Sequence, residues 1–278
     1  MTETNKANIL DRLTEGITQL TSSERWQDWL NMQSKFHRYS FNNTLLIMQQ
    51  RPEATQVAGY NAWRKLDRFV RKGEKGIWIL APMIYKADSG DGSADDSTER
   101  VLRGFKPVSV FDLAQTDGRE LPQNSSRLDG QDVGNVFPKL RQVALGLGFS
   151  VEDTDELAEG VNGDCNHSMN RIRVRISNAP AQRVKTLAHE LGHAILHTPG
   201  DGRPDDRGLM ELEAESVAFV VCANNGIDTD DYTFGYVTGW VGGGDEARDA
   251  IKASGARIQR AADQILTAMI GDEMAEVA

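Results

Sequence analysis

Apolar residues recur at helical spacing in the first part of the chain. Ile9, Leu13, Ile17 and Leu20 fall three or four positions apart, which predicts an amphipathic helix. Residues 21–24 interrupt the pattern, and a serine there suits the start of the next helix because its hydroxyl can accept a backbone N–H. We expect Ser22 or Ser23 to cap the second helix, whose core residues would be Trp26, Trp29, Leu30 and Phe36. A third helix should follow and end before Pro52.

Extended segments alternate with helices in the remainder. Strands are predicted at residues 77–80, 105–113 and 149–151, and helices at residues 136–147, 185–197, 211–223 and 251–269. Residues 171–176 alternate strictly between Arg and an apolar residue, so they predict an amphipathic strand. We expect this strand either at the edge of a sheet beside a cleft, where an extended substrate could pair with it, or as an ordinary sheet strand with one buried face. Its arginines, Arg171, Arg173 and Arg175, are either one polar sheet face or an added nucleic-acid surface.

Two polar stretches divide the chain. Residues 87–100 are rich in Gly, Ser and Asp and are predicted to form a flexible acidic loop. A second polar run supplies the expected linker at residues 123–134. The predicted fold is therefore α+β with two domains, residues 1–122, containing the acidic loop, and residues 135–278.

Composition indicates a cytoplasmic protein. The 278 residues are 39% hydrophobic and 26% charged, which is typical of globular proteins, and no apolar run is long enough to cross a membrane. The start of the sequence lacks the layout of a signal peptide. The only cysteines, Cys165 and Cys222, form no CxxC pair, so we expect free thiols in a reducing compartment.

The net charge of −10 hides an asymmetry between the two parts of the chain. Residues 1–86 hold 13 Lys and Arg against 8 Asp and Glu, net +5, whereas the rest holds 18 against 33, net −15. This difference favours a polyanionic partner for the first part only.

The sequence from Lys185 to His197 contains the HExxH pattern of zinc metallopeptidases. On a helix, His189 and His193 share one face about one turn apart, roughly 6 Å, so two imidazoles can hold one ion. Glu190 is turned about 100° away and can accept a proton from a water beside the ion without being a ligand. The alternative is a chance match on a surface helix.

A third ligand has to come from elsewhere in the chain. His197 follows His189 by eight residues, about 12 Å along a helix, too far for one ion, so we expect it to be a wall or helix-end residue. Glu211 and Glu215 share a face of the apolar helix that follows, where a carboxylate is costly unless it is paired or bound to metal. We predict Glu211 as the third ligand and Glu215 as a residue that orients a ligand histidine; the alternative is that both are solvated at the helix start. Glu213 is expected to be exposed.

The most basic segment of the chain lies at residues 64–75. It contains Arg64, Lys65, Arg68, Arg71, Lys72 and Lys75, follows Trp63, and ends in a turn. Cations beside aromatic rings suit single-stranded nucleic acid, since the cations follow the phosphates and the rings stack on bases. A solvated hairpin with core aromatics is the alternative reading of the same composition.

Both parts of the chain resemble one family. HELGHAILH followed by ELEAESVAFVV is similar to the zincin domains of ImmA/IrrE and ArdC relatives, and this resemblance implies His189, His193 and Glu211 as ligands and Glu190 as base. YSFNN, LLIMQQRPEATQVAGYNAW, RFVRKGEKGIWILAP and GFKPVSVFDLAQTDGRELP resemble the N-terminal domain of ArdC-type antirestriction proteins, a domain described as binding single-stranded DNA. One departure is Asp67, where the family usually has glycine. The residues then expected to contact DNA are Tyr39, Ser40, Asn43, Trp63, Arg64, Arg68, Arg71, Lys72 and Lys75.

The resemblance predicts a single-stranded-DNA-binding antirestriction protein with a zincin-like metallopeptidase domain. Zinc would lower the pKa of a bound water towards about 7, and Glu190 would remove its proton before attack on a peptide carbonyl. The His/His/Glu set favours Zn²⁺ but also suits Mn²⁺ or Fe²⁺. The substrate would be a DNA-associated protein; the alternatives are a DNA-protecting protein with a structural metal, or a zincin that cleaves one repressor.

Overall fold

The computed structural model describes residues 3–86, 100–121, 133–200, 204–229, 232, 234 and 244–270. The chain is an α+β protein, as predicted, and its contacts divide it into two compact units. The first unit contains residues 1–16 and 45–121, and the second contains residues 17–44 and 122–278. Residues 17–44 thus pack with the C-terminal part of the chain, although they precede the boundary expected near residue 122. The predicted acidic loop, except Arg100, and linker residues 123–132 lie outside the described residues.

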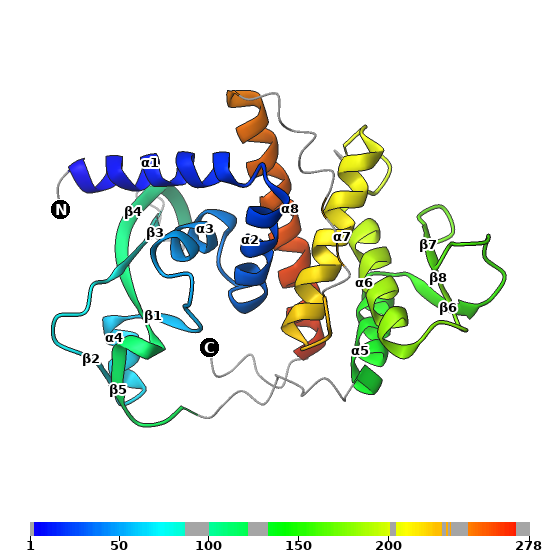
Figure 1. Ribbon diagram of the computed structural model, residues 1–278, viewed down its shortest axis with the longest axis horizontal. Helices are drawn as coiled ribbons and strands as arrows, with labels where there is room; N and C mark the ends of the chain where they lie inside the picture. The colour runs from blue at the N-terminus through cyan, green and yellow to red at the C-terminus, as the bar shows by residue number, and fades with distance from the viewer. Residues whose placement is uncertain are drawn as a thin grey trace, which may run out of the picture. The chain divides into compact units, whose positions relative to one another are not determined.

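Strands dominate the first unit. Its three-stranded sheet has the order β1-β4-β3, in which β3 (Ile77–Lys86) and β4 (Arg100–Asp112) form a long antiparallel ladder (Figure 1). The strand β1 (Val57–Gly59) pairs with the other end of β4, and β2 (Arg68–Val70) pairs with β5 (Thr116–Gly118) as a separate ribbon. The remaining elements are the short helices α4 (Tyr60–Lys65) and η1 (Leu113–Gln115), with parts of α1 (Glu3–Gln19) and α3 (Phe41–Gln50).

Two local features follow from single residues. The Ser40 hydroxyl accepts the Asn43 backbone N–H at 3.4 Å and so caps α3, which ends before Pro52 as predicted. Asp67, at the family's glycine position, adopts the left-handed conformation with φ 56°. Aspartate tolerates this conformation better than most residues. The turn before Arg68 is therefore kept without glycine.

Helices dominate the second unit. In Figure 1, α2 (Ser23–Lys35), α8 (Asp245–Ile270), α7 (Arg207–Asn224) and α6 (Pro180–Leu196) run beside one another, with α5 (Val133–Gly146) against α6. The Ser22 hydroxyl caps α2, one of the two serines expected there. The predicted core residues Trp26, Trp29, Leu30 and Phe36 are buried, and the Trp26 indole N–H donates to the Ser216 hydroxyl of α7 at 3.0 Å.

A small sheet packs on the other side of α6. Its order is β6-β8-β7, with β8 (Arg171–Arg175) parallel to β6 (Ser150–Thr154) and antiparallel to β7 (Gly163–Asn166). The prediction that β8 is an edge strand is wrong: both of its sides are paired, and Ile172 and Val174 are fully buried. Strict alternation shows that one face is buried, not that a strand edge is free. The edge strand on the side of α6 is β7.

The helices α6 and α7 approach each other closely at a glycine. A Cβ added to Gly192 would lie 2.9 Å from Ala214 Cα, a distance that side chains do not tolerate. A glycine at this position of α6 therefore brings the first turns of α7 against the HExxH motif.

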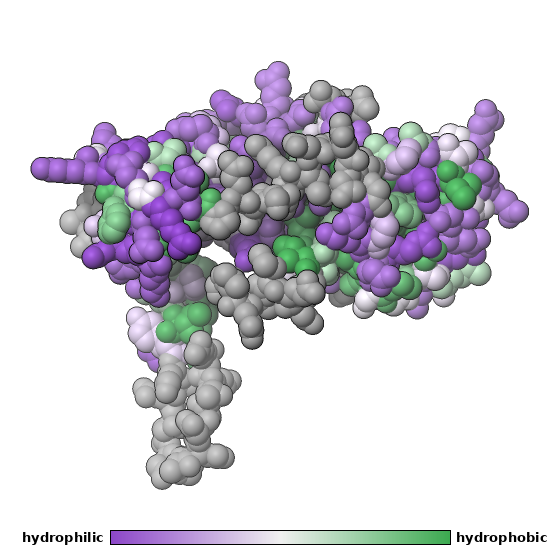
Figure 2. Space-filling model, turned by 90° about the horizontal axis from the view of Figure 1, so that it is seen from below, coloured by the Kyte–Doolittle hydropathy of each residue, from purple (hydrophilic) through white to green (hydrophobic). Residues whose placement is uncertain are grey.

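The face drawn in Figure 2 is mostly hydrophilic, with isolated hydrophobic residues. Among the described helices, none combines the length and the apolar composition that crossing a membrane requires. Cys165 and Cys222 are both free, and burial raises the pKa of each thiol to about 12.

Candidate metal centre

Three side chains from α6 and α7 converge on one point. His189 Nε2 and His193 Nε2 lie 3.0 Å apart, as their spacing of one helical turn predicts. Glu211, in the first turns of α7, places Oε2 at 3.4 Å from His189 Nε2 and 3.5 Å from His193 Nε2. The sequence-predicted ligands are thus brought together, and within the described residues they are the group whose donor atoms could hold a metal ion.

The spacing of these donors fits a divalent ion. Ligand atoms about 2.0 Å from a tetrahedral ion lie about 3.3 Å apart, close to the three distances between these atoms. Burial lowers the pKa of His189, but hydrogen bonds to Glu211 and Glu215 outweigh burial and raise it to about 10. Contacts with His189 and then with His193 hold the pKa of Glu211 far below its usual range. The cluster therefore favours a positive charge between the carboxylates and imidazoles, which a metal ion also supplies.

Each histidine has a partner on its other ring nitrogen. Glu215 Oε2 lies 2.9 Å from His189 Nδ1, in the position from which a carboxylate orients a ligand imidazole. His193 Nδ1 instead lies 2.9 Å from His197 Nδ1. His197 follows the end of α6 and is not in the ligand group, in agreement with its expected helix-end position.

Glu213 is a correction to the sequence-based prediction. It was expected to be exposed, but its side chain is fully buried and accepts hydrogen bonds from Ser254 and Arg257 of α8. A third contact joins it to His197 Nε2 at 3.2 Å. The sequence did hold a sign of this burial, since Ser216, Val217 and Val220 share the helix face of Glu213 and are buried as well.

Glu190 lies beside the ligands and faces a cavity. Its side chain is buried, which raises its pKa to about 7, with His189 opposing the rise. The cavity has a volume of about 400 Å³ and is bordered by α6, by the start of β7 and by Tyr232. Gly163 leaves the space in front of the acid open, because a Cβ there would lie 3.1 Å from Glu190 Oε1.

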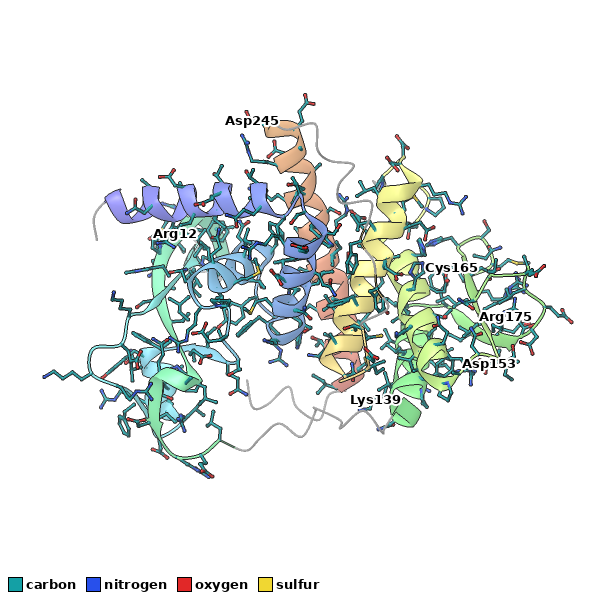
Figure 3. All side chains as sticks on the ribbon, in the orientation of Figure 1. Arg12, Lys139, Asp153, Cys165, Arg175 and Asp245 are labelled. Carbon is teal, nitrogen blue, oxygen red and sulfur yellow. The ribbon has the colours of Figure 1, made fainter. Side chains whose placement is uncertain are left out.

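Other groups near the cavity are less suited to chemistry. Tyr232 lines the cavity, but its hydroxyl donates to Cys222 Sγ at 3.6 Å. Figure 3 labels Cys165 on the small sheet, together with Asp153 and Arg175. Cys165 belongs to β7, and its raised pKa keeps the thiol protonated.

The residues predicted to contact DNA differ widely in their surroundings. Trp63 is 2% exposed, and its indole N–H donates to the Phe111 carbonyl at 2.8 Å, so its ring offers no face to a base. Arg68 donates to the Thr116 hydroxyl and carbonyl at 2.8 and 2.9 Å, between β2 and β5. Arg71 pairs with Glu74 at 2.8 Å and Asp117 at 3.2 Å. Arg68 and Arg71 thus hold the ribbon and its turn together, and Trp63 joins α4 to β4.

The other predicted contacts remain on the surface of the two units. Arg64, Lys72 and Lys75 are exposed and form no ion pair with the described residues. Tyr39 and Asn43 are half-buried and Ser40 is exposed; these three belong to the second unit. The prediction overlooked Tyr60 and Phe69, whose side chains are 49% and 53% exposed beside the same basic residues in the sequence.

The arginines of β8 are not a free basic surface. Arg173 pairs with Asp164, and Arg171 lies 3.5 Å from Glu152. Arg175 donates to backbone carbonyls, including Ala158 at 2.8 Å and Val161 at 3.0 Å. These contacts favour the polar sheet face of the two alternatives.

Comparisons with known proteins match both parts of the chain. Residues 2–111 match the N-terminal domain of anti-restriction factor ArdC, and residues 147–225 match the IrrE N-terminal-like domain of the M78 peptidases. An uncharacterized protein of Bacillus anthracis is 21% identical over 286 residues, covering 88% of this chain and 48% of that protein. The chain thus spans about half the length of this curated relative.

Two crystal structures of the antirestriction ArdC protein from plasmid R388 are also similar. The Mn(II)-bound structure has a TM-score of 0.58 at 18% identity and covers 94% of this chain and 99% of its own. The metal-free structure has a TM-score of 0.49 at 20% identity, with coverages of 82% and 84%. Two family models thus match in order along the chain, the ArdC N-terminal domain over residues 2–111 and the IrrE N-terminal-like domain over residues 147–225. The fold is similar to that of the Mn(II)-bound ArdC protein.

Proposed function

We propose that this protein is an antirestriction protein that binds single-stranded DNA and hydrolyses DNA-associated proteins at a divalent metal centre. The observation that carries the peptidase part is the convergence of His189, His193 and Glu211, with the carboxylate of Glu190 next to them at a cavity. The matched IrrE-like domain supports it.

The residues of the site divide the chemistry among them. His189, His193 and Glu211 would hold the ion, which supplies Lewis-acid activation of a water and of a peptide carbonyl. Glu190 would take a proton from the attacking water and return it to the leaving amine. Glu215 fixes the orientation of His189. The cavity beside Glu190 gives room for a peptide segment.

We propose Zn²⁺ as the ion, with Mn²⁺ and Fe²⁺ as alternatives. Two imidazoles and one carboxylate suit all three metals, because ligand type alone does not separate them. Mn(II) was found in the ArdC structure from plasmid R388, which supports a test of manganese beside zinc.

The DNA part of the proposal rests on the ArdC N-terminal domain and on charge. Residues 1–86 carry a net charge of +5. The exposed cations Arg64, Lys72 and Lys75 lie close in sequence to the exposed rings of Tyr60 and Phe69, and this combination suits single strands. DNA binding would bring the metal centre to proteins bound on incoming DNA.

Substitution of the acid tests the peptidase. Glu190→Gln removes the proton acceptor and keeps the shape, so we expect peptide hydrolysis to fall by about 10² to 10⁴-fold while metal content stays that of the wild type. His193→Ala, measured in parallel, should lose the metal. If Glu190→Gln retains full protection of DNA in a restricting host, protection arises from occupancy of the DNA and not from proteolysis.

Binding to oligonucleotides tests the DNA part. We expect a single-stranded oligonucleotide to bind more tightly than its duplex and to lose affinity as salt is raised, since released counterions drive phosphate contacts. Equal or tighter binding of the duplex would contradict the proposal.

A further inference from the structure

We propose that His197 is a positioning residue of the metal centre: it fixes the proton of His193 on Nδ1 and leaves the Nε2 lone pair for the ion. His197 itself is held by the buried carboxylate of Glu213. The inference rests on the proposed function only in that His193 is taken as a ligand.

For a neutral His197, proton bookkeeping along the contacts gives a single arrangement. A carboxylate only accepts hydrogen bonds, so His197 Nε2, 3.2 Å from Glu213 Oε2, has to donate. A neutral imidazole that donates from one nitrogen accepts at the other. His197 Nδ1 is therefore the acceptor in its 2.9 Å contact with His193 Nδ1, which has to carry the hydrogen. The remaining nitrogen of His193, Nε2, then has its lone pair free on the side of Glu211.

The carboxylate of Glu213, at the end of this series of contacts, is held in one orientation by its own hydrogen bonds. Its side chain is fully buried, and it receives donors from two residues of α8, Ser254 and Arg257, besides His197. Arg257 Nε lies 3.0 Å from Oε1, and a second guanidinium nitrogen contacts the same oxygen. With its oxygens engaged by His197 and by donors of α8, the carboxylate has little freedom to turn away from His197.

The two proposed ligand histidines are thus oriented by different devices. Glu215 contacts His189 directly, and its side chain is 37% exposed. His193 has a second imidazole between itself and a carboxylate, and the exposed fractions of His197 and Glu213 are 2% and 0%. The buried position explains why the sequence places a histidine, and not an acid, next to His193: a charge there would need its own partner.

A purely space-filling role for His197 makes a different prediction. If it only fills the volume between α6 and α7, leucine replaces it without effect on His193. If it orients His193, glutamine can replace it, because the amide has an oxygen to accept from His193 and an N–H to donate to Glu213.

The experiment compares His197→Leu with His197→Gln in the full chain. Long-range ¹H–¹⁵N spectra of the metal-free protein, labelled with ¹⁵N-histidine, report which nitrogen of His193 carries the proton. We expect Nδ1–H in the wild type and in His197→Gln, and a mixture of tautomers in His197→Leu. Zinc affinity, measured against a competing chelator, should fall about 10 to 100-fold in His197→Leu and stay within a few-fold of wild type in His197→Gln.

A matched control is His37→Leu. His37 also contacts a carboxylate, Asp263, at 2.9 Å, but neither residue touches the metal centre, so zinc affinity should not change. If His197→Leu fails to fold, the spectrum of the wild-type protein still tests the inference, because it reports directly which nitrogen of His193 carries the proton. A wild-type spectrum with the His193 proton on Nε2, or unchanged zinc affinity in His197→Leu, would overturn the inference. Neither readout measures hydrolysis, so a protein without peptidase activity would defeat the proposed function and leave this test valid.

Discussion

The metal centre and the basic segment at residues 64–75 were both predicted as clusters of side chains. In the structure, the side chains converge in the first region but not in the second. At the metal centre, the predicted donor atoms of His189, His193 and Glu211 lie within 4.8 Å of one another. Next to the basic segment, Trp63 is buried, and within the segment Arg68 and Arg71 are bound to other residues of the first unit. A spacing on a helix fixes which side chains meet, whereas composition leaves their directions open.

The two regions also differ in how they hold charge. Glu213 is buried, and its carboxylate contacts His197 and Arg257 of α8. Loss of either partner would leave part of a buried charge without a hydrogen-bond donor. Lys72 and Arg64 are exposed, where water and salt screen their charges. Removal of the cation that pairs with Glu213 should therefore lower the free energy of unfolding, whereas removal of an exposed cation such as Lys72 or Arg64 should alter binding only.

The largest effect is expected for Arg257→Leu. This change leaves the buried Glu213 carboxylate without its cation, and breaking such a pair costs about 3 to 5 kcal/mol of unfolding free energy. Urea denaturation of the metal-free protein measures it. Arg248→Leu, on the same helix, is the matched control: its pair with Asp245, whose side chain is 88% exposed, should contribute less than about 1 kcal/mol. Equal costs would mean that Glu213 does not depend on its cation.

Gly192→Ala should have the next largest effect. The new Cβ would lie 2.9 Å from Ala214 Cα, so α6 and α7 have to separate, at a cost of about 2 kcal/mol. Because Glu211 is on α7, the separation should also weaken zinc binding. Gly146→Ala, whose Cβ meets nothing within 4 Å, should leave both quantities near their wild-type values. Denaturation measures the stability of both variants, and chelator competition measures their zinc affinity. Unchanged zinc affinity in Gly192→Ala would show that zinc binding does not depend on the distance between α6 and α7.

How far the sequence predicts this site depends on the physical origin of each contact. The pairing of His189 with His193, and the single face shared by Glu211 and Glu215, follow from the helical period alone. The contact of His197 with Glu213 joins two helices, so it depends on how they pack, and no spacing in the sequence specifies it. Alternation likewise predicted that β8 has a buried face but did not predict its neighbours β6 and β7.

The basic segment was harder to predict for a related reason. Arg68 and Lys72 look alike in composition, but Arg68 lies opposite Gly118 in the β2–β5 pair and bonds to Thr116. Lys72 lies in the turn that follows β2 and is exposed. The pairing of β2 with a strand more than forty residues away decides these roles, and that pairing is not visible in a short window of sequence.

Arg68→Ala should therefore reduce stability. It removes the hydrogen bonds that join the guanidinium to Thr116 on β5, and we expect a loss of about 1 to 2 kcal/mol in unfolding free energy. Arg64→Ala, four residues earlier and exposed, should stay within about 0.5 kcal/mol of wild type. Denaturation of both variants measures the difference. An unchanged free energy of unfolding in Arg68→Ala would show that Arg68 does not stabilise the ribbon and is available to bind DNA.

The smallest effect on stability, and the most direct test of the basic segment, is Lys72→Ala. Because Lys72 is exposed and has no ion pair with the described residues, its unfolding free energy should change by less than about 0.5 kcal/mol. If it contacts a phosphate of single-stranded DNA, the slope of log affinity against log salt should become shallower by about 0.7. The control is Lys139→Ala, an exposed lysine of α5 in the second unit, which should keep the wild-type slope. An equal change of slope in both variants would show that DNA binding depends on net charge and not on Lys72 itself. An unchanged slope in Lys72→Ala would show that this lysine does not contact DNA, and it would not bear on the metal centre.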